Sequence, residues 1–140
     1  MSEPEFYDEP DPAAWRLAIR VVAMPADTNA YGDIFGGWLM SQADIAGSTV
    51  AIQAAGGRVA TVAVKEFRFL APVLVGDLVD LYARQLHVGK TSLTVEVRAW
   101  ARGESDPQTR REVAESKISY VAIGQDGRPR PVEASGPTHS

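Results

Sequence analysis

The stretch GGWLMSQADIAGSTVAIQAAGG, residues 36–57, is the longest run of the chain that is typical of a helix. It contains no proline, and the pair Gly56 and Gly57 supplies the left-handed conformation in which many helices end. The run is rich in alanine, glycine and serine, whose small side chains let other elements approach the helix backbone closely. We therefore predict one helix from residue 36 to about residue 54, covered on most of its sides.

A single carboxylate stands in the middle of this predicted helix. Between Ile34 and Gly57, Asp44 is the only charged residue. A carboxylate that faces packed structure is unfavourable unless it is paired, and partial burial makes it a better base near neutral pH. Two interpretations stay open. Asp44 either faces solvent along a narrow polar strip with Ser41 and Gln42, or it is a functional acid that acts as a base or a nucleophile.

The start of the same helix is a candidate site for a negative charge. The first turn of a helix has unpaired backbone N–H groups and a positive dipole end, and glycines such as Gly36 and Gly37 let a ligand approach the backbone. Such a site suits a developing oxyanion or a phosphate, although the pattern is not that of a nucleotide-binding loop. Asn29, in the preceding loop, is either a turn residue or a polar partner of this site.

The rest of the domain is expected to consist of strands. Alternation and β-branched residues predict strands in five segments, which are 15–24, 58–73, 78–88, 91–102 and 111–124. A slip in the alternation at Lys65 and Glu66 indicates a β-bulge, and Gly89 with Lys90 reads as a hairpin turn. Because the connections are short, the strands are expected to be antiparallel. The predicted fold class is α+β, with a five-stranded antiparallel sheet and one long helix.

The two faces of the predicted sheet differ less in polarity than those of a simple amphipathic sheet. In segment 91–102, four apolar residues, Leu93, Val95, Val97 and Ala99, alternate with Thr94, Glu96, Arg98 and Trp100. We expect Trp100 and Tyr120 to lie on the outward face. Apolar residues on both faces suggest that the sheet pairs with a second copy.

Length and composition narrow the classes of protein. The 140 residues suit one domain, which we place at 14–132, between a flexible acidic and proline-rich arm (1–13) and a flexible tail (133–140). A net charge of -4 makes nucleic acid an unexpected partner. The chain has no cysteine, and the spacing of His87 and His139 fits no metal site. No signal peptide or membrane-spanning segment is recognisable, so we expect a cytoplasmic protein without a membrane partner.

The segment MPADTNAYGDIFGGWLMSQADIAG, residues 24–47, closely resembles the signature of bacterial hotdog-fold acyl-CoA thioester hydrolases of the YciA type. Its most specific part is Asn-x-x-Gly-x-x-x-Gly-Gly followed by an aspartate seven residues after the second glycine. The later segments VATVAV, APVLVGD, VGKTS and SYVAIGQDGRPR resemble the same family in the same order. The resemblance extends over roughly residues 16–131.

The resemblance implies a hotdog fold, in which the sheet wraps around the helix, and hydrolysis of acyl-CoA to CoA and a carboxylic acid. It implies that Asp44 is catalytic, that Asn29 positions water or substrate, and that the backbone N–H near Gly37 polarises the thioester carbonyl. The expected substrate-binding residues are Phe35, Gly36, Arg58, Lys90, Thr91, Ser92 and Arg128. No cofactor or metal is expected, since CoA belongs to the substrate.

The resemblance also implies an oligomer. A homodimer is expected to be the smallest active unit, with Asn29 and Asp44 of one site contributed by opposite subunits, and three dimers are expected to form a hexamer. Two other functions stay open. One is an acyl-CoA sensor that binds without catalysis, which would not need Asp44. The other is a hotdog enoyl-CoA hydratase, although such enzymes pair an aspartate with a histidine near the helix start and this chain has none there.

Overall fold

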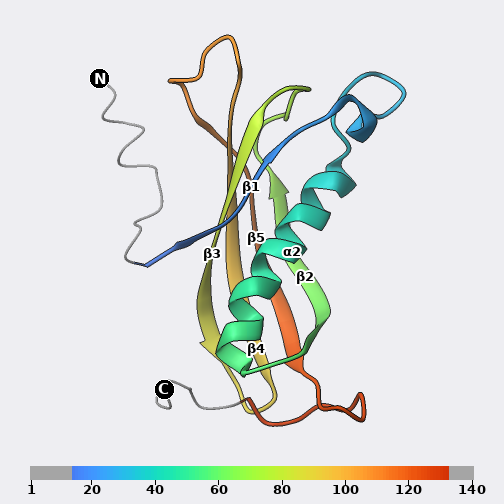
Figure 1. Cartoon of the computed structure of the whole chain (residues 1–140), viewed down its shortest axis with the longest axis vertical. Helices are drawn as coiled ribbons and strands as arrows, with labels where there is room; N and C mark the ends of the chain where they lie inside the picture. The colour runs from blue at the N-terminus through green and yellow to red at the C-terminus, as the bar shows by residue number, and fades with distance from the viewer. Residues whose placement is uncertain (1–13, 133–140) are drawn as a thin grey trace.

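The computed structural model describes residues 14–132. The proposed arm, 1–13, and the proposed tail, 133–140, lie outside the described residues. One long helix lies across one face of a curved sheet (Figure 1). The elements in chain order are β1 (Arg16–Val22), the short 3-10 helix η1 (Pro25–Asp27), α2 (Gly36–Ala55), β2 (Val59–Phe69), β3 (Leu78–Val88), β4 (Ser92–Arg102) and β5 (Arg111–Ala122).

The sheet has the order β1-β3-β4-β5-β2, and every neighbouring pair is antiparallel. The five strands and the single long helix confirm the predicted α+β architecture. The hairpin predicted at Gly89 and Lys90 joins β3 to β4. The alternation predicted for segment 91–102 is also confirmed, because Leu93, Val95, Val97 and Ala99 are all buried.

Helix α2 ends one residue beyond its predicted end. Gly56 follows it with φ 76° and donates its N–H to the carbonyl of Ile52, as expected of a glycine cap. Small residues fill the buried side of the helix, among them Ala43, Ala46 and Gly47. They allow α2 to contact all five strands, so the helix and the inner face of the sheet share one core.

The connection between β2 and β3 differs from a hairpin, although it is short. Leu70 N–H donates to Val113 of β5, whereas Gly76 and Ala23, which follows β1, are joined by a backbone hydrogen bond of 2.8 Å. Residues 70–77 therefore cross from the β5 side of the sheet to the β1 side. As a consequence β2 is an edge strand, which among residues 14–132 pairs with β5 alone.

The predicted β-bulge lies in this edge strand. The register of β2 against β5 shifts between Lys65 and Arg68. Glu66, within the shift, has φ 52°, which a non-glycine residue adopts only in a special backbone conformation. The slip in the sequence alternation at Lys65 and Glu66 thus has a backbone cause.

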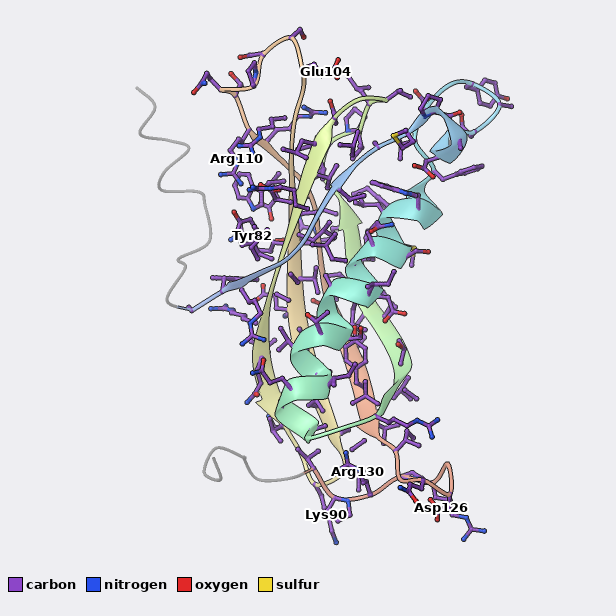
Figure 2. All side chains as sticks on the ribbon, in the orientation of Figure 1. Tyr82, Lys90, Glu104, Arg110, Asp126 and Arg130 are labelled. Atoms are coloured by element: carbon purple, nitrogen blue, oxygen red, sulfur yellow. The ribbon has the colours of Figure 1, made fainter. Side chains whose placement is uncertain are left out.

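The outer face of the sheet carries a paired network of charges. Asp80, almost fully buried, accepts hydrogen bonds from Arg20 at 2.6 and 3.0 Å and from Arg110 at 3.3 Å. Figure 2 shows Arg110 and Tyr82 on the side of the sheet away from the helix. Trp100 lies in this network, with the guanidinium of Arg98 5.4 Å from its ring centroid. Its predicted outward position is therefore confirmed.

Replacing Asp80 with asparagine is expected to lower the free energy of unfolding by about 2–4 kcal/mol, because the buried ion pairs of this carboxylate with Arg20 and Arg110 would be lost. Arg20 is half exposed, which keeps the effect below that of a fully buried pair. Denaturant unfolding measures it. The control is Glu96→Gln, in the more exposed pair with Arg84, where we expect a change under about 1 kcal/mol. Equal losses in the two variants would contradict this account.

Candidate functional site

Asp44 lies near the middle of α2 and faces the sheet, where two hydroxyl groups bind it. Thr61 of β2 donates to its Oδ1 at 2.7 Å. Tyr120 of β5 lies 3.1 Å from the same Oδ1 and 2.8 Å from the Asp44 carbonyl oxygen. The carboxylate is half-buried. Among residues 14–132, Oδ2 has no hydrogen-bond partner, so one oxygen of this carboxylate is held and the other is available.

Tyr120 lies opposite to its expected position. Its side chain is 0% exposed and points to the helix, not outward. The prediction was wrong because it did not carry the strand alternation through to the end of β5. Ser116, Ile118, Tyr120 and Ala122 are buried with period two, and Tyr120 pairs with the inward-facing Leu93. This period was the signal that could have found it.

Thr61 is a site residue that the sequence analysis did not consider. It lies at the start of β2, 17 residues after Asp44. Threonine is common in strands, so its presence there is unremarkable. Only the packing of α2 against the edge of the sheet brings its hydroxyl to the carboxylate.

The start of α2 has the open backbone that the sequence analysis predicted. Phe35 is the residue before the helix, and its side chain makes no capping hydrogen bond. Within the described part of the chain, the N–H groups of Gly36 and Gly37 donate no hydrogen bond. A methyl group added at Gly37 would meet nothing within 4 Å, whereas one at Gly36 would lie 3.2 Å from the ring of Phe69. Gly37 is also exposed, so a ligand can approach its backbone.

A pocket of about 410 Å³ adjoins this helix start. Apolar residues of the loop before α2, of its first turn and of segment 69–73 line it, including Ile34, Phe35, Leu39 and Phe69. Phe35 and Gly36, both predicted as substrate-binding residues, belong to its wall. Its apolar lining suits the hydrocarbon part of a ligand rather than a phosphate.

Asn29 is occupied within its own loop. Its Oδ1 accepts hydrogen bonds from the backbone N–H groups of Tyr31 at 2.8 Å and Asp33 at 3.1 Å, and its own N–H donates to Asp33 at 2.7 Å. These contacts shape the loop before α2. Among the described residues, Asn29 and Asp44 share no hydrogen bond, so one chain alone does not bring the two together.

The remaining predicted substrate-binding residues gather at the other end of α2. Arg58 begins the segment that leads into β2, and Arg128 lies in the turn after β5. Lys90 and Thr91 belong to the turn between β3 and β4, and Ser92 is the first residue of β4. Figure 2 shows Lys90 at this end. A helix of 20 residues is about 30 Å long. Within one chain these residues are therefore far from Gly36 and Gly37.

The sequence predicted neither a metal site nor a membrane-spanning segment. In residues 14–132, no group of three or more His, Asp or Glu side chains is placed to hold a metal ion. No helix in the same part of the chain has the length and apolar character needed to cross a membrane.

The chain is similar to known thioesterases. It matches the thioesterase superfamily over residues 31–107. The acyl-CoA thioester hydrolase YciA of Salmonella typhimurium is 49% identical over 122 residues, which are 86% of this chain and 92% of that protein. HI0827 is a hexameric broad-specificity acyl-coenzyme A thioesterase, and its structure has been solved for a variant in which alanine replaces an aspartate. That structure superposes with a TM-score of 0.82 at 40% identity, covering 86% of this chain and 88% of that one.

A more distant solved structure is the acyl-CoA hydrolase of Staphylococcus aureus. Two variants of it have been solved, one with alanine in place of an aspartate and one with alanine in place of a threonine. Each superposes with a TM-score of 0.72 at 26% identity, covering 84% of this chain and 70% of that one. The family assignment of this chain rests on two findings, the superfamily match and the identity to YciA, which this chain covers almost completely. The chain belongs to the thioesterase superfamily, within its hotdog-fold acyl-CoA thioester hydrolases.

Proposed function

We propose that this acyl-CoA thioester hydrolase uses Asp44 to drive attack on the thioester carbonyl and the amides at the start of α2 to stabilise the oxyanion. Attack by water, with Asp44 taking its proton, or by Asp44 itself forms a C–O bond and a tetrahedral oxyanion. Collapse of that intermediate breaks the C–S bond and releases CoA as a thiolate, which takes up the proton that Asp44 accepted from water or, after direct attack, a proton from solvent. After direct attack, water then hydrolyses the acyl anhydride on Asp44, which releases the carboxylic acid and restores the carboxylate. The observation that carries the proposal is the carboxylate of Asp44, held through Oδ1 and open at Oδ2.

The variants of the Staphylococcus aureus hydrolase support the pairing of Asp44 with Thr61. In that protein the altered aspartate and threonine are 17 positions apart. Asp44 and Thr61 have the same separation, and here they share a hydrogen bond of 2.7 Å. A carboxylate oriented by a hydroxyl is a common arrangement for a base.

The separation of Gly37 from Asp44 favours a site shared by two subunits. Asp44 follows Gly37 by seven positions, which correspond to about 10 Å along the helix axis. An attacking atom has to lie within about 3.5 Å of the carbonyl carbon, while an oxyanion donor has to lie about 3 Å from the carbonyl oxygen. The Gly37 amide and the Asp44 carboxylate of one chain are too far apart along the helix to meet both requirements well, particularly if Asp44 attacks directly.

The exposed edge of β2 offers the interface for such a dimer. Edge strands present unpaired backbone groups to a partner. Val62 and Val64 of β2 and Ile45 and Ile52 of α2 are exposed, so this edge also carries apolar surface. We infer that two copies pair through β2 and join their sheets.

Antiparallel pairing of β2 with itself brings the required groups together. In a symmetric pair centred on the middle of the strand, the end at Phe69 of one copy lies opposite the end at Thr61 of the other. Phe69 packs against Gly36, and Thr61 binds Asp44. The partner subunit's helix start thus comes to this chain's Asp44.

The same arrangement accounts for the distant basic residues. Arg58 lies beside the Thr61 end of β2, and Lys90 and Arg128 lie in turns at the same end of the molecule. In the dimer this end meets the partner's helix start. Cations there suit the phosphates of CoA, while the thioester lies between Asp44 and the partner's amides.

The dimers are expected to assemble further, since HI0827 is hexameric. Light scattering should give a mass about six times that of the 15.1 kDa chain, with dimers as the smallest dissociation product. Active monomers at low protein concentration would contradict the shared site.

A series of acyl-CoA substrates of increasing chain length, assayed with a thiol reagent, tests the activity. CoA release is expected, with a rate that depends on chain length because the pocket at the helix start is finite. Tight binding without CoA release would favour the acyl-CoA sensor. Loss of the conjugated absorbance of an enoyl-CoA without CoA release would favour the hydratase.

A further inference from the structure

Tyr120 is a fully buried residue whose hydroxyl reaches the reacting carboxylate. The hydroxyl has one proton and two acceptors on Asp44, the carbonyl oxygen at 2.8 Å and Oδ1 at 3.1 Å. Thr61 donates to the same Oδ1 from the neighbouring strand. Two hydroxyls from two strands therefore converge on one oxygen of a helix residue, which limits rotation of the carboxylate.

Tyr120 is suited to donate a hydrogen bond because its hydroxyl stays protonated. Burial is the main cause that raises its pKa, followed by the negative charge of Asp44 and the hydrogen bond to it. A tyrosine with a raised pKa keeps its proton throughout the pH range in which proteins are folded. Toward an ionised carboxylate the Tyr120 hydroxyl can therefore act only as a donor.

Gly47 makes this contact possible. It lies on α2 one turn after Asp44, and a methyl group added there would lie 2.4 Å from the Tyr120 oxygen and 3.2 Å from its ring. An alanine at position 47 would be the better helix former by about 1 kcal/mol. The glycine therefore leaves space for the tyrosine hydroxyl, at the expense of helix propensity.

We propose that Tyr120 is a positioning residue, which together with Thr61 holds Oδ1 of Asp44 and leaves Oδ2 to act on the thioester, and that Gly47 is required for this contact. The inference rests on the proposed role of Asp44. Tyr120 itself touches no substrate. Its contribution is to the orientation of the carboxylate, which has to be correct within a fraction of an ångström for efficient attack.

The first test is Tyr120→Phe, which keeps the buried ring and removes only the hydroxyl. We expect kcat to fall about tenfold or more, because a hydrogen bond to a charged group is lost, while KM stays near that of the wild type. The matched control is Tyr82→Phe on the outer face, where the hydroxyl accepts a hydrogen bond from Arg110. This control is expected to keep the wild-type kcat and KM.

The second test is a double-mutant cycle between positions 47 and 120. Gly47→Ala is expected to lower kcat about tenfold by displacing the tyrosine hydroxyl, but to have little further effect in the Tyr120→Phe background, because the displaced contact is already absent. A purely structural role for Gly47 and Tyr120 predicts lower unfolding temperatures but an unchanged kcat per folded protein in all three variants. All rates are measured per folded protein, well below the unfolding temperature of each variant.

The outcomes separate this inference from the proposed function. A wild-type kcat in Tyr120→Phe, or additive effects in the cycle, would overturn the positioning role while leaving Asp44 as the reacting group. A change in KM with constant kcat would also overturn it, since that result indicates substrate binding. If Asp44→Asn keeps the wild-type rate, the proposed function fails instead.

Discussion

Replacing Asp44 with asparagine is expected to lower kcat for acyl-CoA hydrolysis by about two to four powers of ten, the usual contribution of a general base. Asparagine keeps the size of the side chain and an oxygen that Thr61 and Tyr120 can bind. The packing of α2 on the sheet should therefore be retained. An amide, however, neither takes a proton from water near neutral pH nor attacks a thioester as a carboxylate does.

The loss is measured as CoA released per folded enzyme, with the unfolding temperature recorded alongside. Asp106→Asn is the matched control, since it makes the same change in charge and size in the exposed loop between β4 and β5. This control should keep the wild-type kcat. Hydrolysis by Asp44→Asn within a factor of about three of the wild type would contradict a role in general-base or nucleophilic catalysis.

The helix was the most predictable part of the fold. Its end was predicted within one residue because a glycine cap is a local signal that depends on no distant contact. The bulge at Lys65 and Glu66 was predictable for the same reason. In each case a few neighbouring residues carry the whole physical cause.

The position of β2 in the sheet was not predictable in this way. The connection 70–77 is short enough for a hairpin, yet it crosses from the β5 side to the β1 side. Strand order depends on how all five strands pack against α2 and one another, and that is a property of the whole domain. The sequence therefore predicted the number of strands and their direction, but not the edge strand through which a dimer can form.

The site was predictable in part. The apolar run around Asp44 marked the carboxylate, and the two glycines marked the open helix start. Thr61 and Tyr120 were not found, because each becomes a partner of Asp44 only after the helix packs on strands far along the chain. Asn29 was predicted either as a turn residue or as a polar partner of the site. Within one chain its contacts are those of a turn residue.

Mixing two inactive variants is expected to restore activity if Asn29 and Asp44 of one site come from opposite subunits. The variants are Asn29→Asp, which keeps the oxygen that Tyr31 and Asp33 bind but loses the amide donor, and Asp44→Asn. In a heterodimer of the two, both changes fall into one site and the other site is intact. After unfolding and refolding together in equal amounts, about a quarter of the wild-type activity should return, because random two-fold pairing makes half of the dimers mixed.

The reverse combination distinguishes a shared site from incidental stabilisation. A chain that carries both changes is refolded with an equal amount of wild-type chain. If the site is shared, each mixed dimer has one defect in each of its sites, so only wild-type pairs are active and about a quarter of the full rate remains. If each site belongs to one chain, about half remains and the first mixture stays inactive. The two mixtures contain the same four kinds of residue in the same amounts, so a shared site gives about equal rates in both, whereas a site within one chain gives activity only in the second.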